Sequence, residues 1–231
     1  MRQPISATRE ALRRLFFQRC FYLFITLLAF IALAPFVEVG SRGIVIRNLT
    51  NTFVILCAVA AVGRSLLSFL LVVALALPTL VLRWLSLESG SSALFGVSLW
   101  FDAAVYLVTI SLLLRYVFDR EVLTADRLWG AAATYLMIGV LWSFLYAIVD
   151  RTSAASFSIR GSTQSLQLED LIYFSFSTLT TTGFGDIVAI TRLARSATII
   201  ESIIGQLFLA ILIARLVGVY PQQRHTAQTT Q

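Results

Sequence analysis

The sequence predicts an all-α membrane protein with six transmembrane helices and one short segment, between the fifth and the sixth, that enters the membrane without crossing it. Of the 231 residues, 58% are hydrophobic and only 13% are charged, which is about half the charged share of a soluble domain. Apolar runs of about 18 residues or more, each long enough to cross a bilayer, recur along the chain. All 18 basic residues are arginines, which we assign to the membrane boundaries and not to nucleic acid binding.

Composition divides the chain into four parts. Residues 1–19 form a basic amphipathic segment that we expect along the membrane surface. Residues 20–118 form a four-helix membrane domain, and residues 127–220 hold the fifth span, the short segment and the sixth span. Residues 221–231 are a polar tail, too short for a soluble ligand-binding domain. The six spans lie at about 17–37, 44–62, 66–85, 94–118, 128–149 and 194–220.

The number of spans depends on Arg64. Residues 53–82 could form one long helix with Arg64 at its centre, where an arginine costs a few kcal/mol or more. Five spans would also place the arginine-rich N-terminus outside. With six spans and both termini in the cytoplasm, 11 of the 18 arginines lie on the inner side. We therefore expect six spans, Arg64 in a cytoplasmic turn, and a location in the plasma (inner) membrane.

The short segment, 168–179, leads into the stretch TLTTTGFGD. A helix of this length reaches about 18 Å, little more than half of the hydrocarbon thickness. Non-helical backbone at that depth must be buried in protein or line a wet cavity. Glycines permit conformations that turn successive carbonyls toward one axis, where they replace the hydration shell of a monovalent cation. The negative end of the helix dipole also favours a cation, and Glu169 and Asp170 suit the opposite end. A merely structural Gly-x-Gly turn is the alternative.

The segment DLIYFSFSTLTTTGFGD resembles the pore helix and selectivity filter of the potassium channel superfamily. The resemblance covers roughly residues 128–220, and over the first four helices it rests on helix number alone. It implies that the Tyr173–Phe174 pair braces the filter. It also implies that the Thr181 hydroxyl and the carbonyls from Thr181 to Phe184 line the ion path. The family's motif falls on Thr178, Thr180, Thr181, Gly183, Phe184, Gly185 and Asp186.

Two residues depart from the family's usual filter. Thr182 stands where valine or isoleucine is usual, and Phe184 replaces the commoner tyrosine and its phenolic hydrogen bond. Potassium remains the favoured ion, and a weakly selective cation channel is the alternative. One filter segment supplies a quarter of a carbonyl ring, so we expect a homotetramer. We expect potassium ions in the filter, no other cofactor and no enzymatic activity.

Three residues of the last span are further candidates. Gly205 matches the position of a gating hinge, and close helix packing explains it equally well. Glu201 is an ionisable group at membrane depth, which indicates a function. It could act behind the filter, or pair with Arg195 or a loop group near the outer surface. Gln206 faces either the cavity or a neighbouring helix.

The first four helices carry little charge. Asp102 is the one acid well inside them. A structural polar contact and a coupling role are equally good interpretations of it. The fourth span has only Arg115, at its cytoplasmic end, and Arg64 and Arg83 fall at helix ends. Because steep voltage gating needs several charges per subunit, we expect a channel that is not strongly voltage-gated. A transporter would show paired broken helices, and one broken segment is visible. A non-conducting membrane scaffold is the remaining alternative.

Overall fold

The computed structural model describes residues 19–34, 41–62, 66–119, 124–153, 155–159, 161–162 and 166–228. The predicted surface segment, apart from Arg19, and the predicted turn at Arg64 lie outside these residues. The described part contains six long helices and one short helix. They are α2 (Arg19–Leu33), α3 (Ser41–Val62), α4 (Leu66–Ser89), α5 (Ser92–Val117), α6 (Ala125–Thr152), α7 (Leu168–Leu179) and α8 (Arg192–Gln228).

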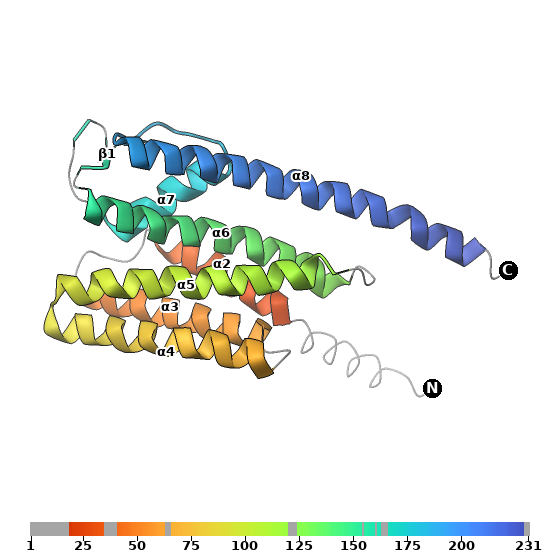
Figure 1. Ribbon diagram of the computed structural model, residues 1–231, viewed down its shortest axis with the longest axis horizontal. Helices are drawn as coiled ribbons and strands as arrows, with labels where there is room; N and C mark the ends of the chain where they lie inside the picture. Colours follow the sequence, from red (N-terminus) through yellow and green to blue (C-terminus); the bar gives the residue numbers. More distant parts are fainter. Residues whose placement is uncertain are drawn as a thin grey trace, which may run out of the picture.

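The long helices form an antiparallel bundle in which consecutive helices run in opposite directions (Figure 1). Helix α6 lies between the two halves of the molecule, because it packs on α2 and α5 on one side and on α7 and α8 on the other. Among the described residues, four helices, α4, α5, α6 and α8, are long and apolar enough to cross a membrane. Helix α2 has 15 residues, and the apolar part of α3 covers only Asn48–Ala61. The expected six spans are therefore supported for four helices.

Helix ends differ from the predicted ones in two places that matter. The third span was expected to stop near residue 85, but α4 continues to Ser89, so Arg83 lies inside the helix and is only 2% exposed. Helix α8 continues to Gln228, although we expected a tail from Pro221. A proline inside a helix removes one backbone hydrogen bond and crowds the carbonyl four residues earlier, which is why we expected the helix to end there. The short helix α7 has the predicted bounds.

A small antiparallel sheet was not predicted. Strand β1 (Phe157–Ile159) pairs antiparallel with β2 (Ile187–Ala189). Each strand has three residues, too few for a clear alternating pattern. Tertiary packing stabilises the strand conformation that the local sequence does not favour by itself, because the Phe157 side chain is fully buried. Since β2 begins directly after Asp186, the sheet holds the chain that leaves the TTTGFGD stretch.

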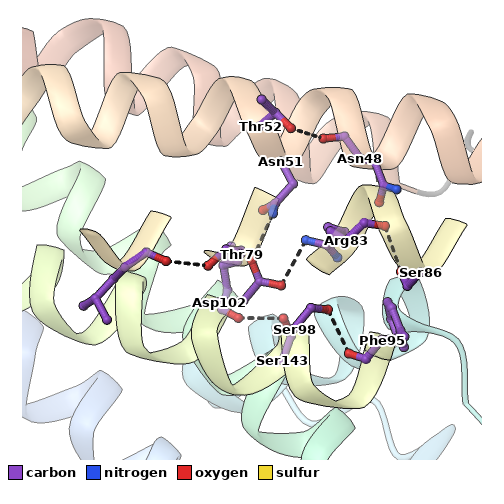
Figure 2. Close-up of polar contacts among 12 residues, drawn as sticks. Asn48, Asn51, Thr52, Thr79, Arg83, Ser86, Phe95, Ser98, Asp102 and Ser143 are labelled. Carbon is purple, nitrogen blue, oxygen red and sulfur yellow. Dashed lines mark hydrogen bonds and ion pairs between the residues drawn. The ribbon is translucent and has the colours of Figure 1, made fainter. Parts of the chain in front are cut away.

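The four-helix part contains a buried polar cluster (Figure 2). Arg83 of α4 donates through Nη1 to Asp102 Oδ2 at 3.1 Å, and the Asn51 amide of α3 donates to Asp102 Oδ1 at 3.2 Å. Asp102, on α5, is 0% exposed. The three side chains therefore connect α3, α4 and α5, and they identify the partners of the acid singled out in the sequence.

Candidate ion-conduction site

Helix α7 begins with a reciprocal pair of caps. The Gln167 side chain accepts from the backbone N–H of Asp170, and the Asp170 carboxylate accepts from the Gln167 N–H at 3.1 Å. With Glu169, these acids lie at the positive end of the helix dipole. The opposite end of α7 leads directly into the TTTGFGD stretch, so the partial negative charge of the helix faces that stretch.

Ser177 of α7 organises the stretch that follows. Its carbonyl accepts from the N–H groups of Thr182 at 2.9 Å and Gly183 at 3.1 Å. Its hydroxyl lies 3.4 Å from the Phe184 N–H, which donates to it. Three consecutive backbone N–H groups are therefore turned toward a single residue of the short helix.

The orientation of the carbonyls follows from these bonds. In a trans peptide the C=O of one residue points opposite to the N–H of the next. Because the N–H groups from Thr182 to Phe184 point at α7, the carbonyls from Thr181 to Gly183 point away from it. The backbone φ angle is positive at Thr181 (56°), Gly183 (58°) and Gly185 (78°). Every second residue from Thr181 to Gly185 therefore has a positive φ. Such an alternation allows successive carbonyl groups to point to the same side of the chain.

Thr181 is the unusual residue of this series. Glycine adopts positive φ readily, whereas a β-branched residue with positive φ is an outlier. Ala155 is the other non-glycine with positive φ in the described part of the chain, and it lies in a loop. Strain of this kind costs about 1–3 kcal/mol and persists where the surrounding structure imposes it. The Thr181 N–H donates to the Thr178 carbonyl at 2.9 Å, which is one such restraint.

The other threonines hold the turn between α7 and the stretch. The Thr180 hydroxyl lies 2.7 Å from the Phe176 carbonyl oxygen, to which it donates, and 2.9 Å from the Thr182 hydroxyl. The unusual hydroxyl at position 182 therefore has a partner within the same loop. Thr178 is buried, with a relative exposure of 7%.

The two aromatic residues predicted to brace the filter point to different sides. Phe174 is buried against the rings of Tyr146 at 5.1 Å and Phe157 at 5.3 Å. Tyr173 is exposed and stacks on Phe184, with ring centroids 5.8 Å apart and planes 12° from parallel. Phe174 thus packs behind the stretch, while Tyr173 contacts its outer part.

Helix α8 approaches the end of α7 closely at Gly205. A Cβ at this position would lie 2.2 Å from the Leu179 carbonyl oxygen, so the close approach requires glycine. The Leu179 carbonyl also accepts from the Tyr135 hydroxyl of α6 at 3.3 Å. Close packing therefore explains Gly205, and a hinge there stays a prediction. Gln206, the next residue, has an exposed side chain in the single chain.

Glu201 is fully buried behind the stretch. Its Oε2 accepts a hydrogen bond from the Tyr146 hydroxyl of α6, and its Oε1 lies 2.5 Å from the Ser175 hydroxyl of α7. Arg195, one of the partners considered from the sequence, instead donates through Nε to the Ala189 carbonyl at 3.1 Å. The structure thus brings Glu201 together with α6 and α7, one turn before Gly205 on α8.

Sequence reasoning missed three polar residues of this region, Ser175, Ser177 and Tyr146. A signal for the serines was available, because a polar side chain in a short membrane-embedded helix needs a partner. Tyr146 carried no comparable signal, since tyrosine is common in membrane proteins. Its role depends on the packing of α6 against α7 and α8.

Residues 128–221 match the model of a family described as an ion channel. The match begins near the start of α6 and covers α7, the TTTGFGD stretch and most of α8. No curated protein and no solved structure matches the chain. The match supports an ion channel domain in this part of the chain, and the apolar helices indicate an integral membrane protein. Residues 1–127 lie outside the match.

Proposed function

We propose that the protein is a homotetrameric channel that conducts monovalent cations, and potassium in particular, through the TTTGFGD stretch. Residues Thr181 to Asp186 form the filter in this proposal, and Tyr173, Phe174, Thr178 and Thr180 support it. The channel resides in the plasma (inner) membrane with both termini in the cytoplasm, as the arginine distribution favours.

The orientation of the filter backbone is the observation that carries this proposal. Three consecutive N–H groups donate to Ser177, so the carbonyls from Thr181 to Gly183 point away from α7. Carbonyl oxygens that face away from their own subunit need a ligand in a membrane. A dehydrated monovalent cation, which needs a shell of oxygens, fits that requirement.

The surface of α8 supports assembly into a ring. Ile199, Ile203, Leu207 and Ile211 recur at every fourth position, and each is more than half exposed in the single chain. A second feature is a groove of about 650 Å³ over α7, lined in part by Tyr173, Phe176 and Phe184. Four copies around an axis would cover these surfaces and complete the ring of carbonyls. A stable monomer or dimer as the sole species in native mass spectrometry would contradict the assembly.

The charges of the four-helix part favour a channel with weak voltage dependence. A charge that crosses the full field gains about 2.3 kcal/mol per 100 mV, so steep gating needs several moving charges per subunit. Helix α5 carries Asp102 and, at its end, Arg115. Because Asp102 pairs with Arg83, the pair moves no net charge if both helices move together. Planar-bilayer recordings test this point, and a steep, sigmoidal opening curve would overturn it.

Potassium flux from liposomes that contain the purified protein tests the main proposal. Wild type should release potassium, barium should block the release, and sodium should pass more slowly. Gly183→Ala and Gly185→Ala should abolish flux while the tetramer persists, because each would place a Cβ at a positive φ. Wild-type flux in both variants would show that the ion path lies elsewhere.

A weakly selective cation channel is the second candidate, and the filter composition favours it. Phe184 has no phenolic hydroxyl, and Thr182 adds a hydroxyl that bonds within the loop. Equal rates of potassium and sodium flux in the same liposomes would support this candidate. A complete absence of flux from correctly assembled protein would favour the non-conducting scaffold.

A further inference from the structure

The hydrogen bonds around Glu201 are unusual because they outnumber the protons that a carboxylate and its neighbours provide. Tyr146 contacts Oε2, and the Ser175 hydroxyl oxygen lies 2.5 Å from Oε1 and 2.7 Å from the Gly139 carbonyl oxygen. These are three contacts between pairs of oxygen atoms at hydrogen-bond distance. Each such contact needs one proton between the two oxygens, since two unprotonated oxygens repel at this distance.

Two of the three protons have clear sources. Tyr146 has one hydroxyl proton and Ser175 has one, while the Gly139 carbonyl has none. If Glu201 were ionised, the Ser175 proton would have to serve both of its contacts. The third proton can come only from the carboxyl group of Glu201. The chain of bonds then runs from Tyr146 to Oε2, from protonated Oε1 to Ser175, and from Ser175 to Gly139.

The surroundings of Glu201 agree with a neutral acid. A buried carboxylate needs a cation or several donors. Tyr146 and Tyr135 of α6 are the titratable groups of the packed helices that interact with Glu201, and α7 contributes the Ser175 hydroxyl. On α8 itself, Arg195 is directed to the Ala189 carbonyl. Within the described residues, Glu201 has no ion pair.

We infer that Glu201 holds a proton at neutral pH, and that the hydrogen-bond chain Tyr146–Glu201–Ser175–Gly139 fixes the pore helix between the outer and inner helices. Glu201 is a positioning residue in this view, because it touches neither the ion path nor the filter backbone. If Glu201 loses its proton, only two protons remain for the three contacts. Ser175 must then give up its hydrogen bond either to Glu201 or to Gly139. Release of α7 at this point disturbs the filter and stops conduction.

Infrared difference spectroscopy of the full-length protein in liposomes tests the proton directly. At neutral pH, Glu201→Gln should remove one carbonyl band of a protonated carboxylic acid relative to wild type. Glu88→Gln serves as the matched control, because Glu88 is exposed at the end of α4 and should contribute a carboxylate band. Loss of a carboxylate band in Glu201→Gln would overturn the inference. This measurement does not depend on conduction, so it decides the point even if the proposed function is wrong.

Potassium flux as a function of pH tests the consequence, and it rests on the proposed function. Glutamine keeps all three contacts, since its oxygen accepts from Tyr146 and its NH₂ donates to Ser175. Flux of Glu201→Gln at neutral pH should therefore lie within about twofold of wild type. At alkaline pH, wild type and Glu88→Gln should lose flux by about tenfold or more, whereas Glu201→Gln should not. An equal alkaline loss in all three proteins would show that another group is responsible.

Discussion

The two halves of the molecule each bury an acidic side chain completely, and they treat it differently. In the four-helix part, Asp102 accepts from the Arg83 guanidinium and from the Asn51 amide. In the part that matches the ion channel family (residues 128–221, called the pore part below), Glu201 lies between the hydroxyls of Tyr146 and Ser175, with no ion pair among the described residues. Asp102 is therefore an ionised carboxylate whose charge is balanced by Arg83. Glu201 has no such cation, so the protein accommodates it best as a neutral, protonated acid.

The completeness of the bonding also differs between the two regions. Within the described residues, Arg83 Nε and Nη2, Asn51 Oδ1 and the Tyr106 hydroxyl are buried without a partner. In the pore part, both oxygens of Glu201 have partners. An incompletely bonded network fixes geometry less strictly than a complete one. The strict geometry of this molecule is therefore concentrated behind the TTTGFGD stretch.

The largest expected effect is the loss of the charge on Asp102. Asp102→Asn leaves the Arg83 guanidinium buried without a counter-charge, and breaking a buried pair in this way costs about 3–5 kcal/mol. If Glu201 is neutral, Glu201→Gln removes no charge and should leave the free energy of unfolding almost unchanged. Thermal unfolding in detergent measures both variants. Similar losses for the two would show that the acids are not held in different states.

A double variant separates the ion pair from general packing. Arg83→Gln with Asp102→Asn removes both charges, so it should be more stable than either single variant. A loss equal to the sum of the single losses would mean that the two side chains do not interact.

The second prediction concerns the close approach of Gly205 to the end of α7. Gly205→Ala places a Cβ 2.2 Å from a backbone carbonyl, which cannot move aside as a side chain can. Such overpacking costs about 1–3 kcal/mol, and it should reduce flux because it displaces the end of α7. Gly218→Ala is the control, because no atom lies within 4 Å of a Cβ built there. If Gly205→Ala unfolds like wild type but opens abnormally, then the hinge role is the better explanation.

Two tyrosines give a smaller and more direct test of the comparison. Tyr146→Phe removes a hydrogen bond to Glu201 and should cost about 1–2 kcal/mol. Tyr106→Phe removes a buried hydroxyl without a partner, so it should leave stability unchanged or raise it. Both residues are fully buried and both rings pack on phenylalanine. Equal effects in thermal unfolding would contradict the difference in bonding.

The sequence predicted the local features of the pore part well. The bounds of α7 follow from a mainly apolar and aromatic segment of 12 residues, with two acids in its first turn and threonines directly after it. The positive φ at Gly183 and Gly185 agrees with the demand for glycine. These features could be predicted because they are determined by residues that are close together in the sequence. The long apolar runs also predicted the helices, although their ends shifted by several residues, as at α4 and α8.

The contacts between distant segments could not be predicted. Asp102 and Arg83 are 19 positions apart, and Glu201 and Tyr146 are 55 apart. Each pairing depends on the rotation of two helices about their axes, which apolar residues on all sides do not specify. The β1–β2 sheet was missed for a related reason, since strands of three residues form only when a partner is present.

The smallest expected effect lies in the TTTGFGD stretch, which we propose to be the filter. There an aromatic residue without a hydroxyl, Phe184, lies in front of the completely bonded residues around Glu201. Phe184 stacks on the ring of Tyr173. Phe184→Tyr adds a phenol that restrains the filter's diameter if it reaches a partner, so it should keep conduction and raise the ratio of potassium to sodium flux. Tyr173→Phe is the matched change, because it removes a phenol from the same stacked pair and should lower that ratio. Liposome flux with each cation measures both variants. Unchanged ratios in both would mean that the phenols do not set the filter's width, and that its selectivity rests on the backbone bonds to Ser177 instead.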